Sequence, residues 1–414
     1  MFNLTPKPEE VFTPKAPTIN EKMYVDRSEL ENRLKELISG SKHIIVHGES
    51  GNGKTWLYKN VFSETKTPYS VVNLGNASRL GSISAAITEK INRSKGDDRV
   101  LSQIVVSGGV EFLPGGVGLK GAKEWLYEAV EREPYDAMMR LIRSSEKSKK
   151  GILVLDNFET ILQNAALVKE LADMIILLDD DDYAEHDVKL CIVGVPTNIR
   201  DYLSTANASQ SLANRLSELP EVARMSVDEA RSLLTRGLRD LLKINISDSV
   251  IDDISWSTDR IAQYLHELGL EVARVALRND ATAEGEEFRM AEELWFNQNF
   301  SAARETLEQN LNARETKRGR RNQVIYSLGI IQIEDFKYTD VEKLVRKEFP
   351  QSTQGITLNV TQRLGELEGG THPMIKRIPR GDAYRVIDPK IKIAARVMLQ
   401  KVDGRVERSS NYRG

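Results

Sequence analysis

Eight consecutive residues have the types and the spacing that bind the phosphates of a nucleotide. They are Gly48, Glu49, Ser50, Gly51, Asn52, Gly53, Lys54 and Thr55, in the pattern G-x-x-x-x-G-K-T. Glycines let such a loop wrap until successive backbone N–H groups converge on phosphate oxygens, and a following helix adds its positive N-terminal end. Lys54 is predicted to reach the β- and γ-phosphates, and Thr55 to ligate Mg²⁺. The pattern therefore predicts a P-loop that binds ATP with Mg²⁺, with Trp56 as a further nucleotide contact.

The residues on either side of this loop match the context that a P-loop requires. The apolar run Ile44-Ile45-Val46 precedes it, and a helical pattern follows it. A second apolar run, Ile152 to Leu155, ends at Asp156. This is the Walker B pattern, in which a buried parallel strand delivers a carboxylate beside the P-loop. Asp156 is therefore predicted to hold the Mg²⁺ through water.

A third apolar run ends in polar residues at the corresponding place. Leu190 to Val195 is followed by Pro196-Thr197-Asn198. A polar side chain here is expected near the γ-phosphate, and Asn198 is favoured over Thr197. The same residues are also ordinary turn and capping types, so an exit from strand to helix is the alternative.

Together these motifs resemble those of AAA+ ATPases of the origin-recognition initiator type and of the related STAND-like ATPases. The resemblance covers about residues 25–276, and it includes Tyr24, Arg27 and Glu29 in the segment that opens such proteins and packs against adenine. It implies an α/β fold of the P-loop NTPase class, AAA+ type, with a parallel sheet, a helical lid and a C-terminal winged helix. In this family Asn198 falls at the sensor 1 position.

The resemblance also implies two catalytic arginines. Arg215 falls at the position of the arginine finger, which acts on the γ-phosphate of a neighbouring subunit, so a homo-oligomer is expected. Arg260 falls near sensor 2 in the lid. An arginine on a helix surface is also commonly solvated or ion-paired.

The chain departs from the family pattern after Asp156. Many AAA+ proteins place a catalytic glutamate directly after the Walker B aspartate, whereas this chain has Asn157-Phe158-Glu159. Glu159 could orient the attacking water, or it could be a first-turn glutamate stabilised by a helix N-terminus. Hydrolysis is therefore expected to be slow and to depend on the oligomer.

Two further stretches have simple alternative readings. In residues 104–121 apolar and polar residues alternate around glycines, which predicts an inserted β-hairpin. The hairpin could contact DNA or a protein partner, or it could be a surface hairpin without a function. The acidic run 179–182 predicts a solvated loop, because Mg²⁺ takes only one or two carboxylates together with phosphate.

Composition limits the class of protein. The 414 residues are 40% hydrophobic and 29% charged, enough for two or three domains with sizeable cores. No apolar run is long enough to cross a membrane, and residues 1–20 lack the apolar stretch of a signal peptide. One cysteine, Cys191, excludes an intrachain disulfide and fits a reducing cytoplasm. The five histidines show no metal-site spacing.

The order of the motifs, the positions of proline and glycine and the spacing of apolar residues predict five segments. They are an extended N-terminal arm at 1–22, the ATPase core at 23–220, the helical lid at 221–282, an irregular helical linker at 283–328 and the winged helix at 329–414.

The C-terminal part differs in charge from the rest. Residues 317–414 hold 20 Lys and Arg against 11 Asp and Glu, a balance of +9, which leaves −12 for the remainder because the whole chain has −3. Helices are predicted at 338–349 and 353–368, and a hairpin is predicted from 374–378 and 383–387. Helices followed by a basic hairpin indicate a winged helix, which favours DNA as the partner.

In a winged helix the second helix would read bases and the hairpin would contact phosphate. The base-reading residues would be Thr357, Asn359, Thr361, Gln362 and Arg363. The phosphate contacts would be Lys376, Arg377 and Arg380. The basic cluster 317–321 could reach the same backbone or be a solvated linker.

The sequence is compatible with two functions. One is an ATP-dependent DNA-binding AAA+ protein in which the nucleotide assembles subunits. The other is a STAND-like nucleotide switch, in signalling or phage defence, whose C-terminal domain docks a protein partner or effector.

Overall fold

The computed structural model describes residues 6–94, 133–145, 150–195, 212, 214–312, 319–378 and 382–409. The predicted hairpin at 104–121, Asn198 and Arg380 lie outside these residues. The chain forms two compact units. One is Ala16–Arg224, and the other is Met225–Gly414 together with Met1–Lys15.

A five-stranded parallel sheet forms the centre of the first unit. Its strands are β1 (His43–His47), β2 (Tyr69–Asn73), β3 (Gly151–Asp156), β4 (Val188–Val195) and β5 (Leu216–Glu218), in the order β2-β3-β4-β1-β5. The three apolar runs predicted as strands are β1, β3 and β4. Because all pairs are parallel, the P-loop after β1 and Asp156 at the end of β3 lie at the same edge of the sheet.

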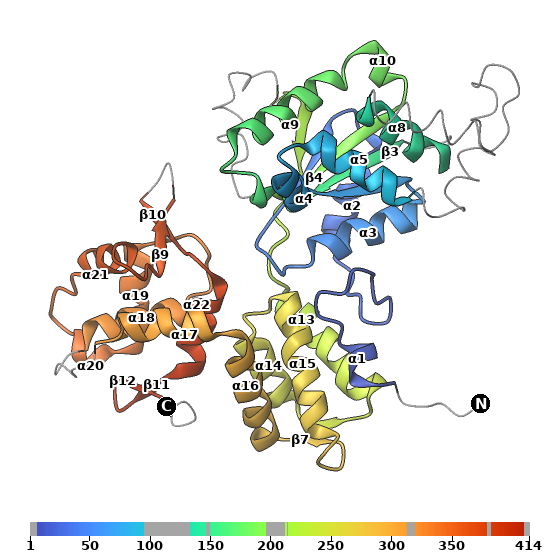
Figure 1. The fold of residues 1–414 in the computed structure, drawn as a ribbon. Helices are drawn as coiled ribbons and strands as arrows, with labels where there is room; N and C mark the ends of the chain where they lie inside the picture. The colour runs from blue at the N-terminus through green and yellow to red at the C-terminus, as the bar shows by residue number, and fades with distance from the viewer. Residues whose placement is uncertain are drawn as a thin grey trace, which may run out of the picture. The chain divides into compact units, whose positions relative to one another are not determined.

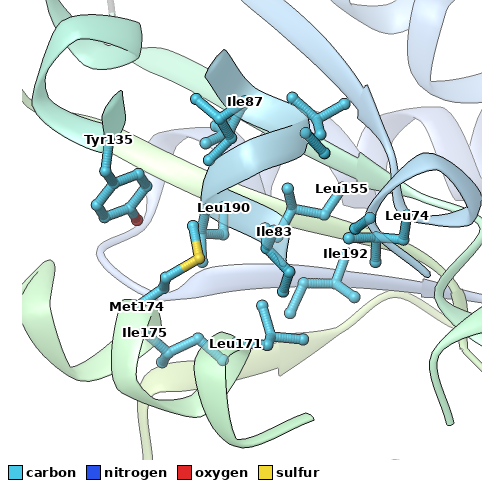
Figure 2. Packing of buried hydrophobic residues seen from close by; sticks show 14 of the residues in the cluster. Leu74, Ile83, Ile87, Tyr135, Leu155, Leu171, Met174, Ile175, Leu190 and Ile192 are labelled. Atoms are coloured by element: carbon cyan, nitrogen blue, oxygen red, sulfur yellow. The ribbon is translucent and has the colours of Figure 1, made fainter. Parts of the chain in front are cut away.

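Helices cover both faces of this sheet (Figure 1). They are α2 (Ser28–Ser39), α3 (Lys54–Thr65), α4 (Leu74–Leu80), α5 (Ile83–Ser94), α8 (Pro134–Ser145), the 3-10 turn η2 (Phe158–Thr160), α9 (Ala165–Leu177) and α10 (Asp181–Ala184). Alternate strand residues face opposite layers, since side chains in a strand point to the two faces in turn. Ile44 and Val46 pack with α2 and α3, whereas Ile45 packs with α4, α5, α8 and α9. Figure 2 shows the second layer, where Leu155, Leu190 and Ile192 of the sheet meet helix side chains.

The acidic run does not form a loop throughout. Asp180 caps α10 by accepting a hydrogen bond from the Asp182 N–H, and Asp181 and Asp182 lie in the first turn of that helix. Acidic residues stabilise this end of a helix, so this run starts a short helix where a solvated loop was predicted.

Helices dominate the second unit up to residue 310. They are α13 (Val227–Leu234), the π-helix η3 (Thr235–Leu241), α14 (Asp248–Ser257), α15 (Ala262–Ala276), α16 (Gly285–Asn299) and α17 (Ser301–Asn310), with β6 (Asn245–Ile246) paired to β7 (Thr282–Ala283). The stretch expected to be irregular from 283 thus contains two regular helices. Its aromatic residues Trp295, Phe296 and Phe300 are buried and pack ring against ring.

The C-terminal segment alternates helices with short strands. Its elements are α18 (Arg320–Ile330), β8 (Phe336–Lys337), α19 (Tyr338–Glu348), α20 (Pro350–Thr353), α21 (Val360–Glu368), β9 (Ile375–Arg377), β10 (Ala383–Val386), α22 (Pro389–Met398), β11 (Leu399–Val402) and β12 (Arg405–Arg408). Strand β10 lies between β8 and β9 and pairs antiparallel with both. The predicted basic hairpin is therefore β9 and β10.

The helix predicted over 353–368 is wrong in its first half. The chain ends α20 at Thr353, and α21 begins only at Val360. Gly355 and Asn359 have φ of +68° and +52°, which a continuous right-handed helix excludes. Thr357 and Asn359 therefore lie before the helix, and only Thr361, Gln362 and Arg363 lie on it.

The N-terminal arm is not extended throughout. Residues Pro8–Val11 form the short helix α1 beside α15. Val11 and Phe12 are buried, and the Phe12 ring fills the space that a side chain at Gly269 would take. The Thr13 N–H donates to Nδ1 of His266. This anchors the arm in the second unit.

Across the described ranges, no helix is long and apolar enough to cross a membrane.

Candidate functional site

The P-loop has the backbone that a phosphate cradle needs. Gly48, Gly51 and Gly53 all have positive φ, at +138°, +87° and +89°. Gly53 is the N-cap of α3, and no side chain caps the helix there. The first N–H groups of α3 are therefore not bound by a capping side chain, and they form the anion-binding end of the helix.

Lys54 lies within this loop. Its Nζ atom donates to the carbonyl oxygens of Gly48 and Glu49, at 2.9 and 2.8 Å. Burial lowers the pKa of Lys54, and the nearby carboxylates of Glu159 and Asp156 oppose that shift. A cation held by loop carbonyls, at the N-terminus of a helix, fits the triphosphate of ATP.

Asp156 lies at the end of β3 and is oriented by two hydrogen bonds. Its Oδ1 accepts from the Asn157 N–H at 2.9 Å, and its Oδ2 accepts from the Tyr58 hydroxyl at 3.3 Å. Tyr58 is fully buried on α3, one turn after Thr55. The predicted Mg²⁺ ligands are the carboxylate of Asp156 and the hydroxyl of Thr55. One carboxylate and one hydroxyl suit a Mg²⁺ that takes its other ligands from phosphate and water. Sequence reasoning missed Tyr58, although residues three apart on a helix share a face.

Glu159 belongs to the same site. Asn157 has φ of +63°, and the 3-10 turn that follows brings Glu159 back to the edge of the sheet. The residue as a whole is exposed, yet its carboxylate lies against Gly194 of β4. Burial of that carboxylate raises the pKa of Glu159, and the charge of Lys54 opposes the shift. Three of the predicted groups, Lys54, Asp156 and Glu159, are thus brought together.

The P-loop is joined to the segment that leaves the first unit. The Asn52 Nδ2 donates to the Val222 carbonyl at 3.1 Å, and the Val222 N–H donates to the His47 carbonyl at 2.9 Å. Arg27 donates from Nη1 to the Asn52 carbonyl at 3.1 Å and from Nη2 to the Ala223 carbonyl at 2.6 Å. Asn52 was predicted only as a nucleotide-binding residue of the loop, because its contact with Val222 joins residues 170 positions apart.

The two candidate arginines do not join this cluster in the described contacts. Arg215 precedes β5, whose Leu216 pairs with His43 at the start of β1, so it lies at the sheet edge opposite the P-loop. Its Nε pairs with Asp179 at 2.5 Å. Arg260 belongs to the second unit, where its Nη2 donates to Gln332 at 3.1 Å. Trp56 donates from Nε1 to the Ala16 carbonyl, so its indole N–H faces the N-terminal segment.

One family model matches part of the chain. Residues 36–203 match the family model described as "AAA domain". No curated protein matches the sequence. Among solved structures, the Walker-type ATPase PABY2304 of Pyrococcus abyssi is 14% identical, with 90% of this chain and 96% of that chain covered and a TM-score of 0.54.

Two further solved structures cover nearly the whole chain at lower TM-scores. Cdc6p of Pyrobaculum aerophilum is 14% identical, with 94% of this chain and 97% of that chain covered and a TM-score of 0.45. The ORC2 protein of Aeropyrum pernix, solved in ADPNP and ADP complexes, is 15% identical, with 89% and 93% covered and a TM-score of 0.47.

The parallel sheet, the P-loop geometry and the family match agree on the first unit. The chain carries an AAA-type ATPase domain on the α/β P-loop fold, and it takes ATP with Mg²⁺.

Proposed function

We propose that this ATPase couples its nucleotide state to oligomer assembly and to DNA binding through a C-terminal winged helix. The observation that carries the proposal is the order helix, strand, helix, helix, strand, strand over α18, β8, α19, α21, β9 and β10, interrupted only by the four-residue helix α20, with β10 between β8 and β9. Winged helices have this order of elements, which supports the proposal that α21 is the recognition helix and the β9–β10 hairpin is the wing. The sequence resemblance to initiator-type AAA+ proteins supports the same assignment.

The surface of this segment offers a limited set of DNA contacts. Thr361 and Gln362 are exposed on α21, and Lys376 is exposed on β9 with no ion pair among the described residues. Amide and hydroxyl side chains on a helix read base edges, and a lysine on a wing contacts phosphate. These three residues are the core of the proposed interface.

Gln362 and other predicted contacts are engaged within the segment. The Gln362 Nε2 donates to Glu366 at 3.3 Å. Arg363 Nη1 pairs with Glu366 at 2.7 Å, and Arg377 Nη2 donates to the Tyr384 hydroxyl at 2.9 Å and faces Glu368 at 3.4 Å. Arg320 donates to the Ser352 carbonyl, and Arg321 donates to Asn310. This internal pairing favours the second candidate function, a STAND-like switch whose C-terminal segment docks a protein.

DNA binding by the full chain separates these two functions. We expect a labelled duplex to bind with an affinity that falls steeply as salt rises, because phosphate contacts release counterions. Lys376→Glu should weaken binding to all sequences, whereas Gln362→Ala should change sequence preference. Lys243→Glu, an exposed charge reversal in the lid, is the matched control. Absence of duplex binding at low salt would favour the protein-docking switch.

The catalytic part of the proposal assigns Glu159 to orient the attacking water and Arg215 to act on a neighbouring subunit. Mg²⁺ would neutralise charge on the phosphates, held by Thr55 and Asp156. Asn198 and Arg260 are the remaining candidates, at the sensor positions that the family resemblance implies. Arg215→Ala should lower hydrolysis per subunit and leave ATP affinity unchanged, and wild-type activity per subunit should rise with protein concentration. Activity independent of concentration, with a neutral Arg215→Ala, would contradict the shared site.

A further inference from the structure

The carboxylate of Glu159 occupies the place where a side chain at position 194 would begin. A Cβ atom built on Gly194 would lie 2.0 Å from Oε2 of Glu159, 3.1 Å from its Cδ and 3.2 Å from the backbone nitrogen of Phe158. No real Cβ contact is as short as 2.0 Å. Any residue other than glycine at this position must therefore displace the carboxylate.

The backbone of Gly194 has a second requirement. Its φ is +86°, a conformation that residues with a side chain rarely adopt. Gly194 lies near the C-terminal end of β4, at the edge of the sheet where the P-loop and Asp156 lie. The glycine therefore leaves space at the end of β4 that the Glu159 carboxylate fills.

This space matters because the chain lacks a carboxylate directly after Asp156. Asn157 occupies that position, and its left-handed φ, which asparagine tolerates well, starts the 3-10 turn Phe158–Thr160. The turn brings Glu159 to this site, where its carboxylate opposes the burial that lowers the pKa of Lys54, ahead of the carboxylate of Asp156. A carboxylate is thus supplied from three residues further along the chain.

We propose that Gly194 is a positioning residue for Glu159: it keeps open the space at the end of β4 in which the Glu159 carboxylate is held beside Lys54 and Asp156. The inference rests on the proposed role of Glu159 in hydrolysis. The displaced atom is the end of a flexible side chain, so an added methyl group should move the carboxylate rather than unfold the domain.

The test compares Gly194→Ala, Glu159→Ala and the double variant in the full chain. Gly194→Ala should reduce the hydrolysis rate by about 100-fold or more, the usual contribution of a positioned acid or base, with ATP affinity unchanged. The double variant should be no slower than Glu159→Ala alone. The fall in Tm caused by Gly194→Ala should be smaller when Glu159 is already alanine, because only the backbone strain then remains.

Gly81→Ala is the matched control for backbone strain. Gly81 has φ of +74°, and a Cβ there would meet nothing within 4 Å. This variant should lower Tm slightly and leave hydrolysis unchanged.

The outcomes separate the two claims. If Glu159→Ala is inactive but Gly194→Ala hydrolyses ATP at the wild-type rate, the role of Gly194 is wrong and that of Glu159 stands. If Glu159→Ala hydrolyses ATP normally, the proposed role of Glu159 fails. Equal losses of Tm in both backgrounds would show that the carboxylate does not rest on Gly194, which would also overturn the inference.

Discussion

In the first unit the Lys54 side chain donates to two backbone carbonyls and lies near the carboxylates of Asp156 and Glu159. In the second unit, by contrast, two cationic side chains are buried against one carboxylate. Asp259 is 3% exposed, and it pairs with Lys392 at 3.1 Å and with Arg396 at 2.7 Å. Arg396 also lies over the Trp256 ring, at 4.3 Å from its centroid. The ATPase site thus keeps a cation for a ligand, while in the second unit part of the basic charge stabilises the fold.

Part of the positive charge in the C-terminal segment is neutralised by carboxylates of the same unit. A balance of +9 over residues 317–414 indicates an anionic partner, but Lys392, Arg396, Arg363, Arg377 and Arg385 all pair with carboxylates within the unit. The cations available to DNA are therefore fewer than the sequence indicates. Salt-dependent binding should report this smaller number.

Asp259→Asn should cause the largest effect and would test this structural role directly. It leaves two buried cations without their anion, so the free energy of unfolding should fall by about 3–5 kcal/mol. Asparagine keeps the backbone preference of this position, where φ is +51°. Urea unfolding of the full chain measures the change.

Asp252→Asn provides the control for that experiment. Asp252 pairs with Arg231 at 2.6 Å on the surface, where both side chains are over 40% exposed. Removing this pair should cost less than about 1 kcal/mol. Equal losses for the two variants would contradict the contrast between buried and exposed charge.

Lys54→Ala tests the other side of the comparison. Loss of the cation that faces phosphate should cost about 2–5 kcal/mol of binding, which weakens ATP affinity by roughly 30-fold or more. The fold should remain, since among the described residues the Lys54 Nζ donates hydrogen bonds only to carbonyls of its own loop. Lys59→Ala on the same helix, whose Nζ donates to the Pro17 carbonyl, should leave ATP affinity unchanged. A folded Lys54→Ala that binds ATP normally would remove the P-loop assignment.

The two units also contain buried histidines whose pH dependence can be compared. Burial lowers the pKa of His266 to about 4, against an ordinary value of 6.5. Between these values the unfolded chain binds more protons, so the stabilisation is complete above pH 6.5 and is lost as the pH falls toward 4. The difference amounts to roughly 3 kcal/mol at most.

His266→Gln should therefore flatten the pH dependence of unfolding in the second unit. Burial likewise lowers the pKa of His43 to about 4, and His43 lies in the ATPase sheet. The pH dependence of the ATPase unit should thus survive the His266 change. Thermal unfolding between pH 5 and 7.5 measures both, and an unchanged profile for His266→Gln would show that this histidine does not titrate in the expected range.

The smallest effects are expected for two neighbouring residues of the wing, Lys376 and Arg377, which should differ in whether they affect DNA binding or stability. Lys376→Ala should reduce the salt slope of DNA binding by about one and leave stability unchanged, because Lys376 is exposed and unpaired among the described residues. Arg377→Ala should instead lower stability by about 1 kcal/mol, because it removes the contacts to Tyr384 and Glu368. A reversed pattern would mean that Arg377 leaves its partners to bind phosphate.

Local sequence predicted the ATPase fold well. The three central strands β1, β3 and β4 are apolar runs, and the P-loop and Asp156 are set by the few residues around them. Strands β2 and β5 contain polar residues and were not predicted. The contacts of Gly194 with Glu159 and of Asn52 with Val222 could not be predicted, because they join residues 35 and 170 positions apart whose side chains show no periodic pattern. The helical spacing of apolar residues continues through Gly355 and Asn359, so the sequence predicted one helix over 353–368. The positive φ of these two residues separates α20 from α21.

The grouping of the chain has a mechanical consequence. Residues 1–15 belong with 225–414, so the chain crosses between the two units twice, at 15–16 and again at 224–225. A single backbone cleavage at 224–225 would therefore leave residues 16–224 covalently linked to residues 1–15, whose helix α1 packs beside α15 of the second unit.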